Sequence, residues 1–204
     1  MRIVRPMERA VYIVTDIECD GPTPGRNSMI AFASVAVTAD GVEQGRFEAV
    51  LEPLRGAERD PQTWAWWNAQ PEVLAAATEG ARPAAQVVAE FANWVRSFED
   101  GRIFTAVPLA FDGGWIDHYL RLFTPCALVA GHFEEDPLFD GPGVCLKSFA
   151  AGITGQPPWC CTPQSLPLEW FGGHDHTHRA IDDALGYAAL LGNLMQGARG
   201  RGVS

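Results

Sequence analysis

The stretch at residues 11–20, which reads Val-Tyr-Ile-Val-Thr-Asp-Ile-Glu-Cys-Asp, constrains the fold of this chain most strongly. Its first half has no polar alternation, which is typical of a central strand buried on both faces. Side chains alternate along a strand, so Asp16 and Glu18 share one face near its carboxyl end. Two such carboxylates repel each other unless a cation lies between them, and hard ions such as Mg²⁺ or Mn²⁺ prefer oxygen ligands. The alternative is that both acids are ordinary turn residues.

Length and composition indicate one globular unit. The chain has 204 residues, of which 47% are hydrophobic, and this suits one well-filled core better than two. We therefore expect a single domain over residues 1–204. The first apolar run reaches Asp16 too soon for a signal peptide, and no segment approaches the ~20 apolar residues of a membrane span. Five cysteines without paired spacing favour reduced thiols in a cytoplasmic protein over a disulfide framework.

The charge of the chain limits the partners that it can bind. The net charge is −10 and the isoelectric point is near 4.9. Proteins that bind long duplexes normally carry a basic surface, so the composition argues against tight, sequence-specific duplex binding. It is compatible with a protein that holds only a short strand end through metal ions and a few Arg or Lys side chains.

The order of strand and helix patterns predicts an α/β fold. Residues 11–20, 28–38 and 46–51 are typical of three strands in an antiparallel meander, with Asp40-Gly41 as a hairpin turn. Helices and short strands alternate after this meander. The predicted helices begin at Pro61 and then cover 71–77, 83–98, 115–123, 146–153 and 180–196, and the later predicted strands are 102–107 and 143–145. We therefore expect a central mixed sheet, an antiparallel meander plus parallel strands, flanked by helices.

The apolar stripe of the closing helix, residues 180–196, separates the roles of two adjacent acids, Asp182 and Asp183. At about 100° per residue, Asp183 lies on the edge of the apolar stripe of this helix, beside Leu190 and Leu194. Asp182 points to the opposite side. A carboxylate that faces the interior needs a partner. We therefore predict that Asp183 is a functional acid and Asp182 a solvated surface acid.

The helix after Gly114 separates Asp112 from Asp117 by the same reasoning. When its apolar stripe is extended back by one turn, Asp112 falls in line with it, whereas Asp117 falls well off it. The alternative role for Asp112 is an N-cap, which is common for Asp before a helix and needs no metal. Capping and metal binding can coexist.

His178 stands five residues before Asp183, at the start of the closing helix. A neutral imidazole there can take a proton from a water molecule, because its unperturbed pKa is near ~6.5. One alternative is an exposed loop histidine. Another is a zinc cluster with His174 and His176, which as a closed site would need a further ligand at suitable spacing. The downstream acid is Asp183, inside a helix, and this disfavours the zinc alternative.

Three short motifs follow one another along the chain and are specific as an ordered set. They read Asp16-x-Glu18, Ala110-Phe111-Asp112 and His178-x-Ala180-x-x-Asp183. Together they resemble the motifs of the DEDDh 3′–5′ exonuclease family, whose relatives include oligoribonuclease, RNase T and the proofreading exonuclease subunit of DNA polymerase. The segment Thr63-x-x-Trp66-Trp67-x-x-Gln70 resembles a feature of a bacterial and phage subgroup that includes mycobacterial exoribonucleases. The resemblance implies a ribonuclease H-like fold.

The resemblance also implies a reaction. The expected enzyme removes nucleoside 5′-monophosphates from the 3′ end of single-stranded RNA or short oligonucleotides. Four carboxylates would hold two divalent ions, Mg²⁺ or Mn²⁺, for in-line phosphoryl displacement. Asp16 would bridge both ions, while Glu18 and Asp183 would complete one of them. Asp112 would contact the other ion, and His178 would deprotonate the attacking water.

The sequence indicates the residues that contact the substrate less clearly than it indicates the metal ligands. Family members contact the terminal nucleotide with residues just after the first motif, and two basic residues lie near the motifs in sequence. The resulting candidates are Arg26, Asn27, Ser28, Met29, Lys147 and Arg179. Each has an alternative as a loop, strand or surface residue. Family members often carry His-Asn shortly before the Phe-Asp pair, and residues 106–112 read Ala-Val-Pro-Leu-Ala-Phe-Asp, without that Asn.

The cluster of Trp64, Trp66 and Trp67 has two interpretations. Tryptophans stack on bases in single-strand binding proteins, but at helical spacing they more often belong to a core. We expect core positions for at least two of them. By analogy with homodimeric relatives, this segment is also an expected dimer interface.

Two other functions compete with the RNA exonuclease. One is a DNA exonuclease with a proofreading or repair role, because readout of the 2′-hydroxyl depends on loop geometry. The other is a non-catalytic ribonuclease H-like module that binds nucleic acid or a partner protein. The presence of all five catalytic-type residues, Asp16, Glu18, Asp112, His178 and Asp183, argues against such a module.

Overall fold

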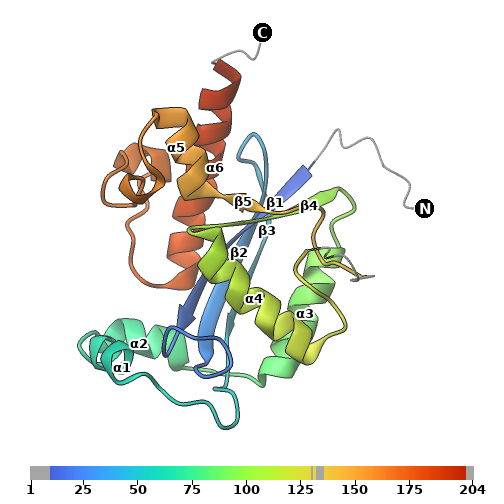
Figure 1. The fold of residues 1–204 in the computed structure, drawn as a ribbon, viewed down its shortest axis with the longest axis vertical. Helices are drawn as coiled ribbons and strands as arrows, with labels where there is room; N and C mark the ends of the chain where they lie inside the picture. The colour runs from blue at the N-terminus through green and yellow to red at the C-terminus, as the bar shows by residue number, and fades with distance from the viewer. Residues whose placement is uncertain (1–9, 130, 132–135, 201–204) are drawn as a thin grey trace.

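A computed structural model describes residues 10–129, 131 and 136–200 of the chain. Its centre is a five-stranded sheet with the order β3-β2-β1-β4-β5 (Figure 1). β1, β2 and β3 form the antiparallel meander, and β4 and β5 continue the sheet in parallel with β1. The strands are β1 (Ala10–Cys19), β2 (Met29–Thr38), β3 (Glu43–Val50), β4 (Gly101–Ala106) and β5 (Val144–Cys145). The predicted mixed sheet is confirmed.

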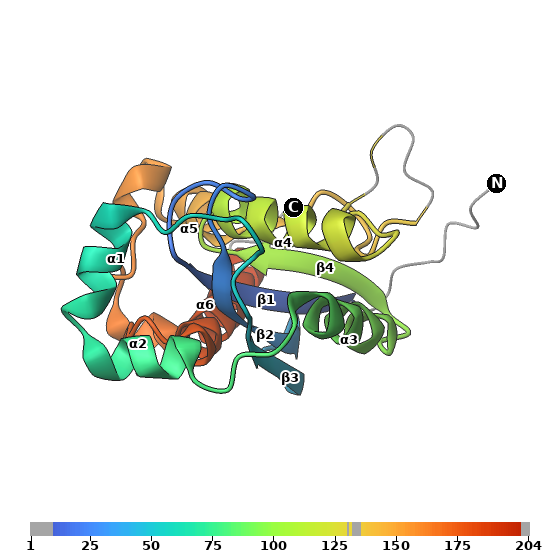
Figure 2. The same ribbon diagram turned by 90° about the horizontal axis from the view of Figure 1, so that it is seen from below.

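Helices cover both faces of the sheet. Figure 1 shows α5 and α6 on one side of the strands and α3 and α4 on the other, and Figure 2 shows the same layers from below. The helices are α1 (Pro61–Asn68), α2 (Pro71–Thr78), α3 (Ala84–Arg96), α4 (Leu109–Phe123), α5 (Leu146–Thr154) and α6 (Ala180–Gly200), with short 3₁₀ turns η1 (Pro158–Cys160) and η2 (Leu168–Phe171). Within the described residues, no helix is long and apolar enough to cross a membrane.

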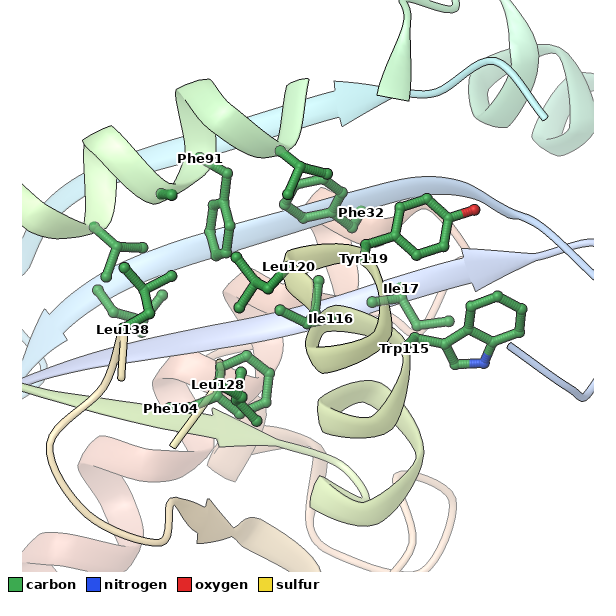
Figure 3. Packing of buried hydrophobic residues seen from close by; sticks show 14 of the residues in the cluster. Ile17, Phe32, Phe91, Phe104, Trp115, Ile116, Tyr119, Leu120, Leu128 and Leu138 are labelled. Carbon is green, nitrogen blue, oxygen red and sulfur yellow. The ribbon is translucent and has the colours of Figure 1, made fainter. Parts of the chain in front are cut away.

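β1 is buried on both faces, as its unbroken apolar pattern predicts. Ile13 and Ile17 belong to the core beneath α3 and α4, whereas Val14 belongs to the core beneath α6. Figure 3 shows the first of these cores, in which Ile116 and Leu120 of α4 pack near Ile17. Because side chains alternate, residues 14, 16 and 18 share the α6 face of the sheet. The acids of β1 are thereby directed toward the first turn of α6.

The helical pair α1–α2 lies at the carboxyl end of β1. Asp60 caps α1 by accepting a hydrogen bond from the backbone N–H of Thr63 at 2.8 Å, and Pro61 occupies the first turn, as predicted. Trp67 is buried, and its indole N–H donates to the carbonyl of Cys19 at 2.9 Å. This hydrogen bond ties α1 to the strand that carries the acids.

The predicted start of α4 is wrong. The sequence favours a helix after the Gly113-Gly114 pair, but α4 begins at Leu109, directly after its N-cap Pro108. Gly113 lies inside the helix, where a Cβ would be 3.4 Å from side-chain atoms of Phe104 and Leu128. The missing side chain therefore permits close packing of α4 on β4 and does not end the helix. Asp112 is consequently a first-turn residue and not the N-cap.

Candidate functional site

Four acids from three elements line one cleft of about 290 Å³. Asp16 and Glu18 come from β1, Asp112 from the first turn of α4 and Asp183 from the first turn of α6. Asp16, Glu18 and Asp183 each offer a carboxylate oxygen within 4.8 Å of the others. Asp112 lies outside that compact group but lines the same cleft. The chain fold thus brings together all four acids that the sequence motifs select.

The predicted burial of Asp183 and Asp112 is confirmed, whereas Asp182 is less solvated than predicted. Asp183 is 2% exposed and Asp112 is 3% exposed. Asp182 is half-buried and accepts a hydrogen bond from the Thr177 hydroxyl at 2.9 Å. Asp117 forms an ion pair with Arg121 at 2.7 Å. Burial therefore separates the cleft acids from their neighbours.

Asp183 is held firmly by the segment that precedes α6. The backbone N–H of Thr177 donates to its Oδ1 at 2.9 Å, and the N–H of His178 donates to its Oδ2 at 3.2 Å. His178 adopts a left-handed backbone conformation with φ of 59°, which costs a non-glycine residue about 1 kcal/mol. Strain of this kind persists where surrounding contacts fix it, and it clusters at functional sites.

The cleft acids are electrostatically strained without a cation. Burial, and then the charges of Glu18, Asp112 and Asp183, raise the pKa of Asp16 well above its ordinary range. Burial and the neighbouring carboxylates raise the pKa of Glu18 in the same way. Burial raises the pKa of Asp112 to about 7, and its Oδ2 is buried without a hydrogen-bond partner among the described residues. This oxygen and the mutual repulsion fit a divalent cation, because a cation would relieve both.

We expect that Asp112→Asn stabilises the metal-free protein at alkaline pH. The carboxyl of Asp112 binds its proton more tightly in the folded state, with a pKa of about 7, than in the unfolded chain, where the value is 3.8. Folding stability is therefore lost as the pH rises from about 4 to about 7, by up to about 4 kcal/mol. The amide has no charge to desolvate, so the gain should appear at pH 8 and vanish near pH 4.

Urea unfolding in EDTA at the two pH values checks this expectation. Asp117→Asn is the matched control, because Asp117 lies on the same helix but pairs with Arg121 outside the cleft. A variant Asp112→Asn that is less stable than wild type at pH 8 would contradict the electrostatic argument.

His178 lies at the edge of the cleft between two other rings. Its imidazole makes edge contacts with Trp66, at 4.8 Å between ring centroids, and with His176, at 4.4 Å. Burial and the neighbouring His176 lower its pKa below 6.5, against an opposing contribution from Asp183. The lowered pKa keeps this imidazole neutral at physiological pH, which is the form that accepts a proton.

His176 contacts the buried acid directly, which the sequence did not indicate. Its Nδ1 lies 2.9 Å from Asp183 Oδ2, and the Tyr187 hydroxyl lies 3.5 Å from the same nitrogen. His176, His178 and Asp183 offer ligand atoms within 4.8 Å of one another, and His174 is not a member of this group. The position of Asp183 inside a helix therefore does not disfavour a histidine site, contrary to the prediction, because the loop folds back over the start of α6.

The three tryptophans divide as expected between core and surface. Trp67 is buried, and Trp64 packs against the same small core beneath the guanidinium of Arg59. Trp66 is 41% exposed and contacts His178. Two of the three are thus packing residues, and Trp66 alone of this cluster presents an open ring next to the cleft.

The candidate substrate contacts are only partly brought to the cleft. Lys147 lines it, at the start of α5. Ser28 and Met29 are fully buried, and the hydroxyl of Ser28 accepts a hydrogen bond from the Leu54 N–H at 2.9 Å. Direct contact between these two side chains and a substrate is therefore not supported, because β2 begins in the core at this point.

The remaining three candidates also lie away from the lining of the cleft. Asn27 is buried, where its side chain accepts from the Thr23 N–H and donates to the Glu58 carbonyl. Arg26 is exposed, and Arg179 is exposed and lies 3.5 Å from Asp182. In contrast, Tyr187 and Phe111 line the cleft and were missed as site residues. Tyr187 follows Asp183 by one helical turn, and this spacing is the signal that could have found it.

The fold matches solved nuclease structures. The nuclease domain of 3′hExo, a DEDDh family member bound to rAMP, is 13% identical, with coverage of 94% of this chain and 93% of that chain and a TM-score of 0.64. A 3′-exonuclease that recognises the histone mRNA stem-loop is 11% identical, with coverage of 93% of this chain and 82% of that chain and a TM-score of 0.64. This chain therefore has the fold of DEDDh exonucleases.

A bacterial enzyme has the same fold within a longer chain. The zinc-bound E. coli ExoI–ssDNA complex is 12% identical, with a TM-score of 0.61 and coverage of 94% of this chain and 41% of that chain. This chain thus spans about two fifths of ExoI. No protein-family model and no curated protein sequence matches this chain. The structural matches confirm the ribonuclease H-like fold that the motifs predict.

Proposed function

We propose that this protein is a metal-dependent 3′–5′ exonuclease of the DEDDh type. It would remove nucleoside 5′-monophosphates one at a time from single-stranded RNA or short oligonucleotides. The observation that carries the proposal is the convergence of four buried or half-buried acids and His178 on one cleft. The fold shared with 3′hExo and ExoI supports the same conclusion.

The acids would hold the cofactor. Asp16, Glu18, Asp112 and Asp183 suit two divalent ions, Mg²⁺ or Mn²⁺, because their oxygens are hard ligands and their charges are uncompensated. When bound, such ions neutralise the phosphate and stabilise the charge that develops on the attacking and leaving oxygens. This compensation also explains how a chain with a net charge of −10 can hold a polyanion.

The protein residues would supply positioning and proton transfer. His178 accepts a proton from the water that attacks the terminal phosphodiester, since its lowered pKa keeps the imidazole neutral. The new bond joins the water oxygen to phosphorus, and the bond from phosphorus to the 3′ oxygen of the preceding nucleotide breaks. That 3′ oxygen then takes a proton from solvent water. The ammonium of Lys147, which lines the cleft, attracts the phosphate. Each cycle leaves a new 3′-hydroxyl for the next.

RNA is the first substrate to test. One of the similar structures is bound to the ribonucleotide rAMP and another recognises a histone mRNA stem-loop, whereas ExoI holds single-stranded DNA. DNA is therefore the alternative. The acidic composition supports a short single strand over a duplex in either case.

Digestion of matched 5′-labelled RNA and DNA oligomers, with Mn²⁺, Mg²⁺ or EDTA, tests the proposal. We expect a ladder that shortens from the 3′ end, requires metal and forms faster on RNA. Faster shortening of DNA would favour the DNA exonuclease. If every oligomer stayed intact with both metals, the non-catalytic module would become the better hypothesis.

A further inference from the structure

The first turn of α6 carries two different groups of ligand atoms that share Asp183. One is the carboxylate group with Asp16 and Glu18, and the other joins Asp183 to His176 and His178. In the second group, His176 Nδ1 lies 2.9 Å from Asp183 Oδ2, and the two imidazole rings are 4.4 Å apart between centroids. The loop at residues 174–178 therefore builds a mixed nitrogen and oxygen site directly beside the oxygen site.

The ligand types in these two groups select different metals. Mg²⁺ and Mn²⁺ favour carboxylates, whereas two imidazoles and one carboxylate form a ligand set that Zn²⁺ uses with a fourth position left to water. Solvent can reach the histidine group, because all three residues line both the main cleft and an adjoining cavity of about 310 Å³. An ion can therefore reach these three residues from either cavity.

We propose that His176, His178 and Asp183 form a second metal site, which takes Zn²⁺ or a similar transition-metal ion and inhibits the enzyme. The inhibitory consequence rests on the proposed function. Zn²⁺ in this site uses the lone pair of His178 that accepts the proton, and it takes an oxygen of Asp183 from the catalytic ions. Cleavage therefore stops while the carboxylates of Asp16 and Glu18 remain in place.

Co²⁺ bound to the full-length protein reports on the site without any catalytic turnover. A four-coordinate Co²⁺ ion with nitrogen ligands absorbs visible light strongly, and an octahedral ion with oxygen ligands absorbs weakly. We expect strong absorption in wild type that Zn²⁺ abolishes by displacement. The affinity should fall roughly 100-fold or more in His176→Gln, since loss of a ligand exceeds the effect of an outer-shell change. His178→Gln provides a second test of the same loss.

Two variants control this experiment. His174→Gln removes an imidazole two residues from His176 that lies outside the ligand group, so it should keep the wild-type absorption. Asp16→Asn damages only the carboxylate group and should also keep it. Absorption that persists in both His176→Gln and His178→Gln, or that is missing from folded wild type, would overturn the proposed site. Thermal melting without metal verifies that each variant is folded.

Zinc inhibition of Mn²⁺-driven cleavage supplies the functional measurement. Each variant is compared with its own zinc-free rate, and the Zn²⁺ concentration that halves this rate should rise at least about tenfold in His176→Gln but not in His174→Gln. An equal response in both variants would contradict inhibition through this site. Co²⁺ binding without cleavage under any condition would remove the proposed function and leave the site. Cleavage without histidine-dependent Co²⁺ binding would support the proposed function and overturn the second metal site.

Discussion

Asp16→Asn is expected to lower the cleavage rate by on the order of 10³-fold, which corresponds to about 4 kcal/mol of transition-state stabilisation. A carboxylate oxygen of Asp16 lies within 4.8 Å of oxygens from Glu18 and Asp183. The charges of Glu18, Asp112 and Asp183 all raise the pKa of Asp16, so this acid interacts with every other carboxylate of the cleft. The amide keeps the size of the side chain but removes the charge and one ligand oxygen. Loss of this ligand should disable metal-assisted displacement as a whole.

Single-turnover cleavage of a 5′-labelled oligonucleotide with Mn²⁺ measures this effect. Asp182→Asn is the matched control, because it neutralises an acid that is adjacent in sequence to Asp183 but does not line the cleft and lies 3.5 Å from Arg179. The control should stay within about threefold of wild type, because Asp182 lies outside the lining of the cleft and Asn can still accept the hydrogen bond from Thr177. A rate in Asp16→Asn above a tenth of wild type would mean that the carboxylate group does not hold the catalytic ions.

Local periodicity was sufficient to predict the scaffold of the site. The alternation of β1 placed Asp16 and Glu18 on one face, and the apolar stripe of α6 separated Asp183 from Asp182. These predictions depend only on the geometry of single elements. The start of α4 was missed because Gly113 has a packing role that no local pattern shows. The homodimer stays a prediction.

Contacts that depend on loops could not be predicted in the same way. Ser28 and Met29 follow the first motif closely, but the loop that ends β1 returns them to the core at the start of β2. Conversely, His176 reaches Asp183 because the chain folds back with a left-handed residue at His178. Such turns depend on hydrogen bonds between side chains and loop backbone, including those that Asp183 accepts from the N–H groups of Thr177 and His178.

His178→Ala is expected to lower the rate of the chemical step by about 10²–10⁴-fold, the usual contribution of a positioned general base. Mn²⁺ affinity should change much less, because the four carboxylates remain. The wild-type rate should rise with pH through the pKa of His178, which burial and His176 hold below 6.5, and then level off. The lowered pKa extends the neutral, proton-accepting form to more acidic pH.

The pH profile distinguishes a base from a merely structural histidine. In His178→Ala the rise that belongs to this imidazole should be absent, whereas His174→Ala should retain both the rise and the rate. Saturating Mn²⁺ and single-turnover conditions keep metal binding and product release out of the measurement. A variant His178→Ala that is slow but keeps the wild-type profile would show that the ring only packs against Trp66 and His176, and that another group takes the proton.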